Sequence, residues 1–82
     1  MLTVPEYPVI DMEATGENIR RLRVERGISV RAIQAYLNLS DVQAIYQWQR
    51  GKKMPSLDHL CALATLFDVS VDDIIVTSIV QI

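Results

Sequence analysis

The chain has 82 residues, half of them hydrophobic, and a single Cys. This length fits one small domain with a modest core, and one Cys excludes an internal disulfide and suits a reducing compartment. The N-terminus is acidic and contains prolines, unlike a signal peptide. No apolar run approaches the roughly 18 residues that span a bilayer. We therefore expect a soluble, cytoplasmic protein.

The net charge of −2 conceals a separation of charge along the chain. All eight Lys and Arg fall within residues 20–53, where Glu25 and Asp41 are the acids, so this segment carries +6. The other eight acids lie outside it without any base, giving −8. A basic centre favours a polyanionic partner more than the net charge suggests, because salt screens charges over about 8–10 Å. The alternative is a chance arrangement on a solvated surface.

The first part of the chain predicts an extended arm and then a helix. Residues 1–15 form the arm, because its prolines exclude helix, and residues 7–12 can be an edge strand. The first helix is expected from residue 16, with Thr15 as its N-cap. Gly27 is expected to end this helix.

Two further helices are expected in the basic segment. Residues 29–37 predict a helix that begins with a Ser cap, and residues 41–50 predict the next one. Ser40 or Asp41 can cap this third helix, and Gly51 can end it in a left-handed conformation. A basic loop then leads to a proline.

The third helix has two different faces. Val42, Ile45 and Trp48 recur at three-residue steps and predict an apolar face, so Trp48 is expected in the core. Amide and guanidinium groups fall along another face, at Gln43, Gln47 and Arg50. Such a helix can pack with one side and read the edge of a polymer with the other.

The last part of the chain predicts a core helix, a short helix and a strand. Residues 56–67 carry an apolar stripe at helical spacing, and residues 70–75 predict a fifth helix capped by Ser70. The β-branched tail, residues 76–82, predicts a strand. The stripe of the fourth helix comprises Leu57, Leu60, Cys61, Ala64 and Phe67.

An exposed apolar strand promotes aggregation, so the tail needs a partner. It can pair with the N-terminal arm as a two-stranded ribbon, or with its symmetry mate in a dimer. We favour pairing with the arm.

The order of these elements and three sequence segments resemble the lambda-repressor-like, Xre-type helix-turn-helix family. The resemblance covers residues 16–75 and implies an all-α fold with a five-helix domain, flanked by the arm (1–15) and the apolar tail (76–82). The segments are I-R-R-L-R-V-E-R-G-I-S from Ile19, I-Y-Q-W-Q-R-G-K-K-M-P-S from Ile45 and L-x-x-L-A-x-L-F-D-V-S-V-D-D-I from Leu60.

The resemblance also implies a set of DNA contacts. In that family the third helix lies in the major groove of double-stranded DNA and the second crosses the backbone. Carried over by position, the base-reading residues are Val42, Gln43 and Gln47. Tyr46 lies on the polar side of the same helix and is added to this base-reading set. The equal alternatives for Tyr46 are a contact with phosphate or sugar and a place covering the second helix. The phosphate contacts are Arg23, Arg31, Arg50, Lys52 and Lys53.

Three positions depart from the family pattern. Val30 replaces the usual Gln or Thr, so a side-chain phosphate contact is lost. Gln49 replaces a Glu that pairs with the Arg matching Arg23, which predicts an Arg–amide hydrogen bond. The turn at residues 37–44 is one residue longer than usual.

No pattern indicates catalysis or a metal site. His59 and Cys61 are two apart on a helix, so they do not face each other, and no further His or Cys is present to complete a zinc site. We expect Cys61 in the core and His59 at the surface.

The sequence thus predicts a DNA-binding transcriptional regulator of the Xre type that is not an enzyme and needs no cofactor or metal. We expect a homodimer, at least on DNA, because half-sites are normally read by dimers. The alternative is a protein-binding adaptor or antitoxin-like module, in which the acidic ends and apolar tail hold a protein partner.

Overall fold

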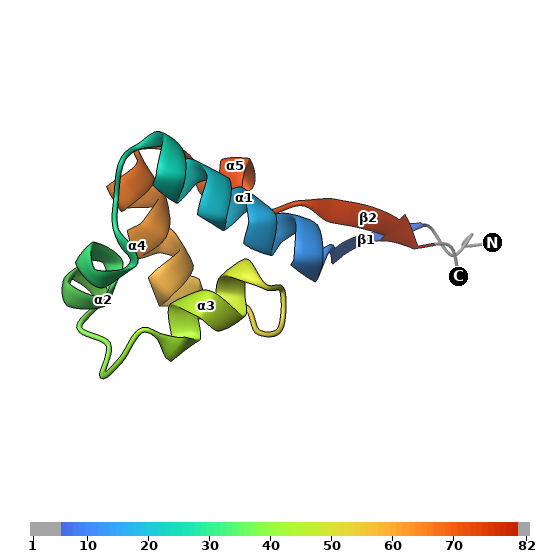
Figure 1. Ribbon diagram of the computed structural model, residues 1–82. Coiled ribbons are helices and arrows are strands. Elements are labelled where there is room, and N and C mark those ends of the chain that lie inside the picture. Colours follow the sequence, from blue (N-terminus) through green and yellow to red (C-terminus); the bar gives the residue numbers. More distant parts are fainter. Residues whose placement is uncertain (1–5, 81–82) are drawn as a thin grey trace.

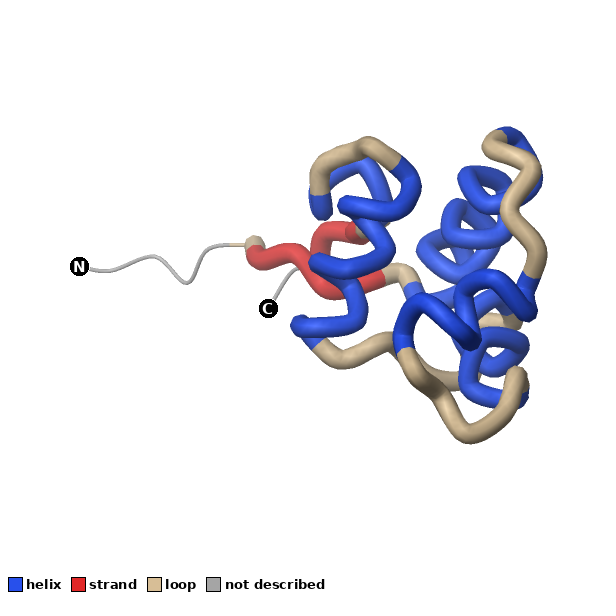
Figure 2. Tube along the Cα trace, turned by 90° about the vertical axis from the view of Figure 1, so that its left-hand side faces the viewer, coloured by secondary structure: helices blue, strands red, loops and turns tan. Residues whose placement is uncertain are grey.

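The computed structural model describes residues 6–80, which form five helices and a two-stranded antiparallel ribbon (Figure 1). The ribbon projects from the helical body, and Figure 2 shows its strands side by side. This confirms the predicted five-helix domain with paired terminal strands. The parts of the predicted arm and tail outside residues 6–80 lie outside the described residues. In chain order the elements are β1 (Tyr7–Ile10), α1 (Met12–Glu25), α2 (Val30–Leu37), α3 (Gln43–Gln49), α4 (Leu57–Phe67), α5 (Val71–Ile74) and β2 (Thr77–Val80).

Helix α1 begins at Met12, earlier than the predicted start at residue 16. Its N-cap is Asp11, whose side chain accepts the Ala14 N–H at 2.9 Å. Thr15, the predicted cap, is buried, and its hydroxyl accepts the Val76 N–H at 2.9 Å and donates to the Val76 carbonyl at 3.2 Å. The prediction was wrong because this partner of Thr15 is distant in the sequence and cannot be read from local cap patterns.

The predicted caps of α2, α4 and α5 and the predicted glycine ends of α1 and α3 are confirmed, whereas the predicted cap of α3 is not. Ser29, Ser56 and Ser70 each accept a backbone N–H in the first turn of α2, α4 and α5. Gly27 and Gly51 adopt left-handed backbone angles, with φ of 66° and 71°. Side-chain capping and the left-handed angles available to Gly thus set these boundaries locally.

Helix α3 is shorter than the predicted span of residues 41–50. Val42 is its N-cap residue and makes no side-chain cap hydrogen bond. Asp41 still binds the start of the helix, because its Oδ1 accepts the Gln43 N–H at 2.8 Å. The longer turn therefore places Asp41 just before the helix rather than in it.

The core lies between the helices. Two residues of α4 that were predicted to face this core, Leu57 and Cys61, are exposed instead. Leu57 is 81% exposed, because it is the first residue of α4 and no described residue covers it. Cys61 is also exposed, because the buried face of α4 centres on Leu60 and Leu63, and a helix turns by about 100° at each residue. The buried hydrophobic residues are Ile19, Leu22, Ile33, Ile45, Trp48, Leu60, Leu63, Ala64, Phe67 and Ile74.

The ribbon joins the two ends of the described chain, which confirms that the tail pairs with the arm. Tyr7 lies opposite Val80, and Ile10 lies opposite Thr77. The pairing continues to the start of α1, where the Asp11 N–H donates to the Val76 carbonyl at 2.8 Å. Strand β2, which would be exposed on both edges without this pairing, thus has β1 as a partner within its own chain.

A reciprocal capping box at α5 makes stability depend on pH. The Ser70 hydroxyl accepts the Asp73 N–H at 3.2 Å, and the Asp73 carboxylate accepts the Ser70 N–H at 3.0 Å. These bonds, the backbone one first, lower the pKa of the Asp73 carboxyl. A lowered pKa in the folded state means that this stabilisation is present above the pKa of the unfolded chain and is lost as pH falls through the folded value.

We expect Asp73→Asn to lower the melting temperature near neutral pH and to have little effect once pH is well below the ordinary Asp pKa of about 3.9. Thermal unfolding followed by circular dichroism across this pH range measures the difference. Asp72→Asn is the matched control, since Asp72 lies in the same turn but outside the capping box. A constant difference between wild type and Asp73→Asn at all pH values would contradict the assignment.

Candidate nucleic-acid interface

Apolar side chains hold one face of α3 in the core. Ile45 is fully buried and Trp48 is 5% exposed. The Trp48 ring lies 5.7 Å from the ring of His59, which is half-buried rather than fully at the surface. The prediction that Trp48 belongs to the core is therefore confirmed.

Two glycines let the backbones of α1 and α3 approach closely. A Cβ atom on Gly16 would lie 2.3 Å from the Trp48 carbonyl oxygen and 2.8 Å from that of Gln49. A Cβ atom on Gly51 would lie 2.8 Å from the Glu13 Cα atom. The beginning of α1 thus packs directly on the end of α3 and fixes its orientation.

The opposite face of α3 presents the predicted base-reading residues on one side. Gln43 and Tyr46 are exposed, Gln47 is half-buried, and Val42 is half-buried at the N-cap. Their spacing of three or four residues places neighbouring side chains next to each other. Within residues 6–80, the side-chain amides of Gln43 and Gln47 have no hydrogen-bond partner. These amides can therefore bind an external donor and acceptor.

Three cations follow this face at the end of α3. The Gln47 carbonyl accepts the Lys52 N–H at 2.9 Å and the Lys53 N–H at 3.4 Å, which folds the loop back on the helix. Arg50 has its guanidinium carbon 5.9 Å from the centre of the Tyr46 ring, within range of a cation–π contact. The three cations are exposed, and none forms an ion pair with another described residue.

The two remaining predicted phosphate contacts lie on α1 and α2. Arg23 is half-buried, and its Nε donates to Gln49 Oε1 at 2.9 Å, which confirms the predicted Arg–amide bond. Its Nη1 also donates to the Ile28 carbonyl at 3.0 Å. Arg31 is exposed on α2, with Nη1 at 3.5 Å from Gln34 Oε1. Arg31 thus remains more available than Arg23.

Arg20 is a residue that the sequence-based site did not include. It shares a stripe of α1 with Gly16 and Arg23, at i, i+4 and i+7. Because Gly16 touches the α3 backbone and Arg23 binds Gln49, Arg20 lies along the same junction. Its side chain is exposed and, among the described residues, makes no ion pair. The helical spacing from Arg23 was the signal that could have identified it.

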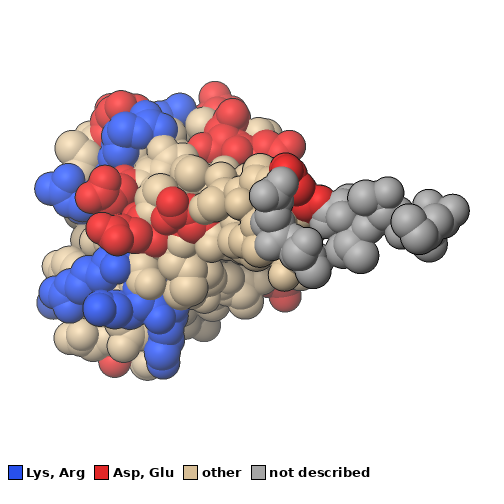
Figure 3. All heavy atoms as spheres, turned by 90° about the vertical axis from the view of Figure 1, so that its right-hand side faces the viewer, with Lys and Arg blue, Asp and Glu red and all other residues tan. Residues whose placement is uncertain are grey.

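The charges on the surface are partly segregated. Figure 3 shows Lys and Arg gathered along one side of the face it draws, with Asp and Glu between them and across the top. Part of this mixing comes from α1, where Glu25 lies 3.0 Å from Arg21 and 3.8 Å from Arg26. The cations at the end of α3 form no such ion pair with a described acid. Position, rather than net charge, thus distinguishes the α3 region.

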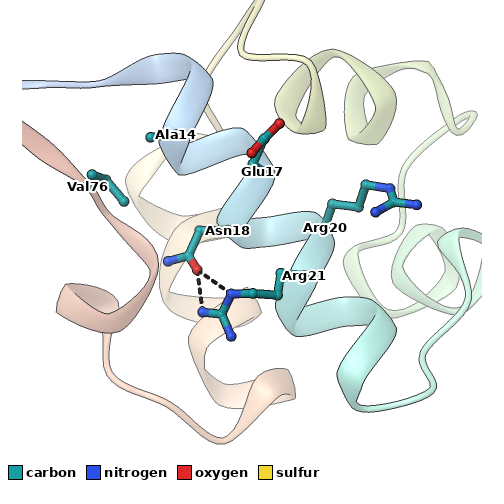
Figure 4. A pocket seen from close by; sticks show the side chains of 6 residues that line it. All are labelled: Ala14, Glu17, Asn18, Arg20, Arg21 and Val76. Atoms are coloured by element: carbon teal, nitrogen blue, oxygen red, sulfur yellow. Dashed lines mark hydrogen bonds between the residues drawn. The ribbon is translucent and has the colours of Figure 1, made fainter.

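An open hollow of about 420 Å³ lies on α1 beside the root of the ribbon (Figure 4). The Arg21 guanidinium already has partners within the protein, since its Nε donates to Asn18 Oδ1 at 3.1 Å and its Nη1 donates to Glu25 at 3.0 Å. Arg20 points away from this network in Figure 4. Acidic, basic and apolar side chains line the hollow together, and this lining does not resemble a catalytic site. Its lining residues are Ala14, Glu17, Asn18, Arg20, Arg21 and Val76.

Within residues 6–80, no helix is long and apolar enough to cross a membrane. The same residues contain no group of three or more His, Cys, Asp and Glu side chains arranged to hold a metal ion.

Comparison with known proteins identifies the family. The helix-turn-helix family model HTH_3 matches residues 19–74. The chain therefore belongs to the lambda-repressor-like, Xre-type helix-turn-helix family of DNA-binding transcription regulators, which is not a family of enzymes. No curated protein matches the chain.

Two solved structures are similar to this one. The restriction-modification controller protein C.AhdI from Aeromonas hydrophila has a TM-score of 0.69 and 26% sequence identity, over 78% of this chain and 96% of that protein. The DNA-binding domain of BldD has a TM-score of 0.66 and 18% identity, over 79% of this chain and 93% of that domain. At this identity the second likeness supports the fold alone.

Proposed function

We propose that the protein regulates transcription by sequence-specific binding of double-stranded DNA, with α3 in the major groove. The observation that carries this proposal is the outer face of α3, where glutamine amides and cations that have no partner among residues 6–80 lie next to each other. The inner face of the same helix is fixed in the core by Ile45 and Trp48. The likeness to the controller protein C.AhdI supports a regulatory role for this chain.

The proposed base contacts follow from side-chain chemistry. Gln43 and Gln47 carry a donor and an acceptor, which match the N6 and N7 groups of adenine in the major groove. Val42 can contact a thymine methyl group, and Tyr46 lies between these positions and Arg50. Gln47 is the stronger assignment, because it is farther from the lengthened turn that precedes Gln43.

The proposed phosphate contacts surround this face. Arg50, Lys52 and Lys53 are exposed cations at the end of α3, and Arg31 lies on α2, the helix that would cross the backbone. Arg20 joins them from the α1–α3 junction. Arg23 contributes charge while it orients Gln49.

We also propose that the regulator acts as a homodimer on DNA. Two-fold related helix-turn-helix units read half-sites whose centres are about 34 Å apart. A dimer reads twice as many base pairs as one protomer, so it reaches the selectivity that a single short helix lacks.

Two classes of substitution should separate base reading from phosphate binding. We expect Gln47→Ala to lose about 1–3 kcal/mol of preference at one base pair while binding random DNA almost as wild type does. Gln43→Ala should act similarly at a neighbouring base pair. Lys53→Ala should weaken binding to all sequences alike. Selection of bound sites from random duplexes, followed by fluorescence anisotropy, measures these effects.

Lys53→Ala is the control for the glutamine variants, since it removes affinity without removing a base contact. Equal losses on selected and random duplexes for both glutamine variants would refute their assignment as base-reading residues. Absence of any selected sequence would refute sequence-specific binding itself.

A further inference from the structure

The β1–β2 ribbon lies outside the part of the chain that the family model matches, residues 19–74. It bears apolar side chains in the open: Tyr7 is 45%, Ile10 is 46% and Ile79 is 61% exposed. In Figure 1 the ribbon extends away from the helices. A two-stranded ribbon has two outer edges, and each edge carries unpaired backbone groups that can bind a further strand.

The pairing register shows which backbone groups point outward. The Asp11 N–H donates to the Val76 carbonyl, so this opposed pair is a hydrogen-bonded one. Hydrogen-bonded and non-hydrogen-bonded pairs alternate along an antiparallel ladder. Alternation makes the pairs at Thr77 and Ile79 non-hydrogen-bonded, so their N–H and C=O groups point away from β1, toward the outer edge of β2.

Among the residues that the structure describes, the outer edge of β1 is protected, whereas that of β2 is not. Pro8 occupies one of the two outward positions of β1 and has no N–H to donate. Carboxylates flank this strand at Glu6 and Asp11, and charges near an edge discourage pairing. The outward positions of β2 both have an N–H, and the sequence has no charged residue, Pro or Gly from residue 74 to residue 82.

The outer edge of β2 is complementary to itself. A two-fold axis at Ser78 would place Thr77 of each protomer opposite Ile79 of the partner subunit. Every outward N–H of one strand would then meet an outward C=O of the other, as in a hydrogen-bonded antiparallel pair. Thr77, Ser78 and Ile79 are all exposed, so their side chains are not covered by the helices.

We propose that two copies of this protein associate through the outer edges of β2, centred on Ser78, to form a continuous four-stranded antiparallel sheet. The lack of charge on β2 favours a second copy over an acidic or basic partner, and the symmetric register fits an identical strand. The association itself does not depend on DNA binding. The inference rests on the proposed function only for the role of this dimer, which is to present two α3 helices to DNA.

A charge swap at Ser78 tests the symmetric register. Since Ser78 would face Ser78 of the partner subunit, Ser78→Lys and Ser78→Asp should each raise the dimer Kd by roughly fivefold, through like charges directly opposed. An equimolar mixture of the two variants should regain the dimer. Sedimentation equilibrium of the full chain without DNA, over a concentration series, measures both effects.

Proline substitution tests the edge. We expect Ile79→Pro to raise the dimer Kd by about tenfold or more, because it removes an outward N–H from each copy. Ile10→Pro is the matched control: it removes an outward N–H from β1 and should leave the dimer Kd unchanged. Circular dichroism checks that both variants remain folded, and anisotropy on an isolated half-site checks that each protomer still binds DNA.

Three outcomes would overturn the inference. They are a wild-type chain that sediments as a monomer at all concentrations, a dimer lost with Ile10→Pro but not with Ile79→Pro, and mixed Ser78 variants that associate no better than either alone. If the protein still binds an isolated DNA half-site in any of these cases, the proposed function stands although the β2 interface is refuted. If the wild-type chain forms the dimer but does not bind a half-site, the proposed function is refuted and the β2 interface stands.

Discussion

Gly16→Ala should lower the free energy of unfolding by about 3 kcal/mol, the upper part of the range for overpacking. The new Cβ atom would lie 2.3 Å from the Trp48 carbonyl oxygen, and backbone atoms cannot move aside as a flexible side chain can. The gain in helix propensity, about 1 kcal/mol, offsets only part of this cost. Urea denaturation followed by circular dichroism and Trp48 fluorescence measures the change.

Gly27→Ala is the matched control for this substitution. A Cβ atom there meets nothing within 4 Å, so the cost comes only from its positive φ of 66°. We expect a loss of about 1–2 kcal/mol, typical of a left-handed residue without glycine. If Gly27→Ala were more destabilising than Gly16→Ala, close packing of α1 on α3 would not be the reason that residue 16 is a glycine.

The same junction links stability to DNA binding. Gly16 and Gly51 set how closely α1 approaches the end of α3, and Arg50 and Lys52 flank Gly51 in the chain. A shift of α3 away from α1 would move these cations together with the outer face. We therefore expect the folded fraction of Gly16→Ala to bind DNA more weakly than wild type.

The second large effect concerns salt. We expect Arg50, Lys52, Lys53 and one or two Arg of the first helices each to neutralise a DNA phosphate and release counterions. The logarithm of the DNA association constant should then fall with the logarithm of the salt concentration, with a slope of about −4 per protomer. Affinity for an isolated half-site should then fall about 250-fold between about 50 and 200 mM salt. Fluorescence anisotropy with a labelled duplex, repeated at several salt concentrations, gives the slope.

Substitutions show which cations supply this slope. Lys52→Ala combined with Lys53→Ala should reduce its magnitude by about 2. Arg21→Ala is the control and should leave it unchanged, because Arg21 is already paired with Glu25 at 3.0 Å. A wild-type slope near zero would contradict DNA binding and would favour the protein-binding alternative.

Much of the fold could be predicted from the sequence because its signals are local. The caps at Ser29, Ser56 and Ser70 bind N–H groups three residues away. Left-handed glycines at the ends of α1 and α3 needed no tertiary information. The burial of Ile45 and Trp48 followed from helical spacing alone.

The candidate site could be predicted only in part. Spacing placed Gln43, Tyr46 and Gln47 on one face of α3, and the structure brings Arg50 next to Tyr46. Helical spacing from Arg23 was a local signal for Arg20, but the close approach of α1 and α3 beside it is set by contacts between residues far apart in the chain. For the same reason the sequence could not show that Arg23 also binds the Ile28 carbonyl.

The sequence by itself thus determined the presence of five helices, the buried face of α3 and the family resemblance, since each depends on residues within a few positions of one another. Tertiary structure alone decided that Thr15 is buried against Val76 and that the α3 backbone approaches Gly16 closely. It also decided that Leu57 and Cys61 are exposed. It also decided which edge of the ribbon is open, because that depends on the hydrogen-bonding phase between the two ends of the described chain. Such long-range pairings leave no local pattern in the sequence.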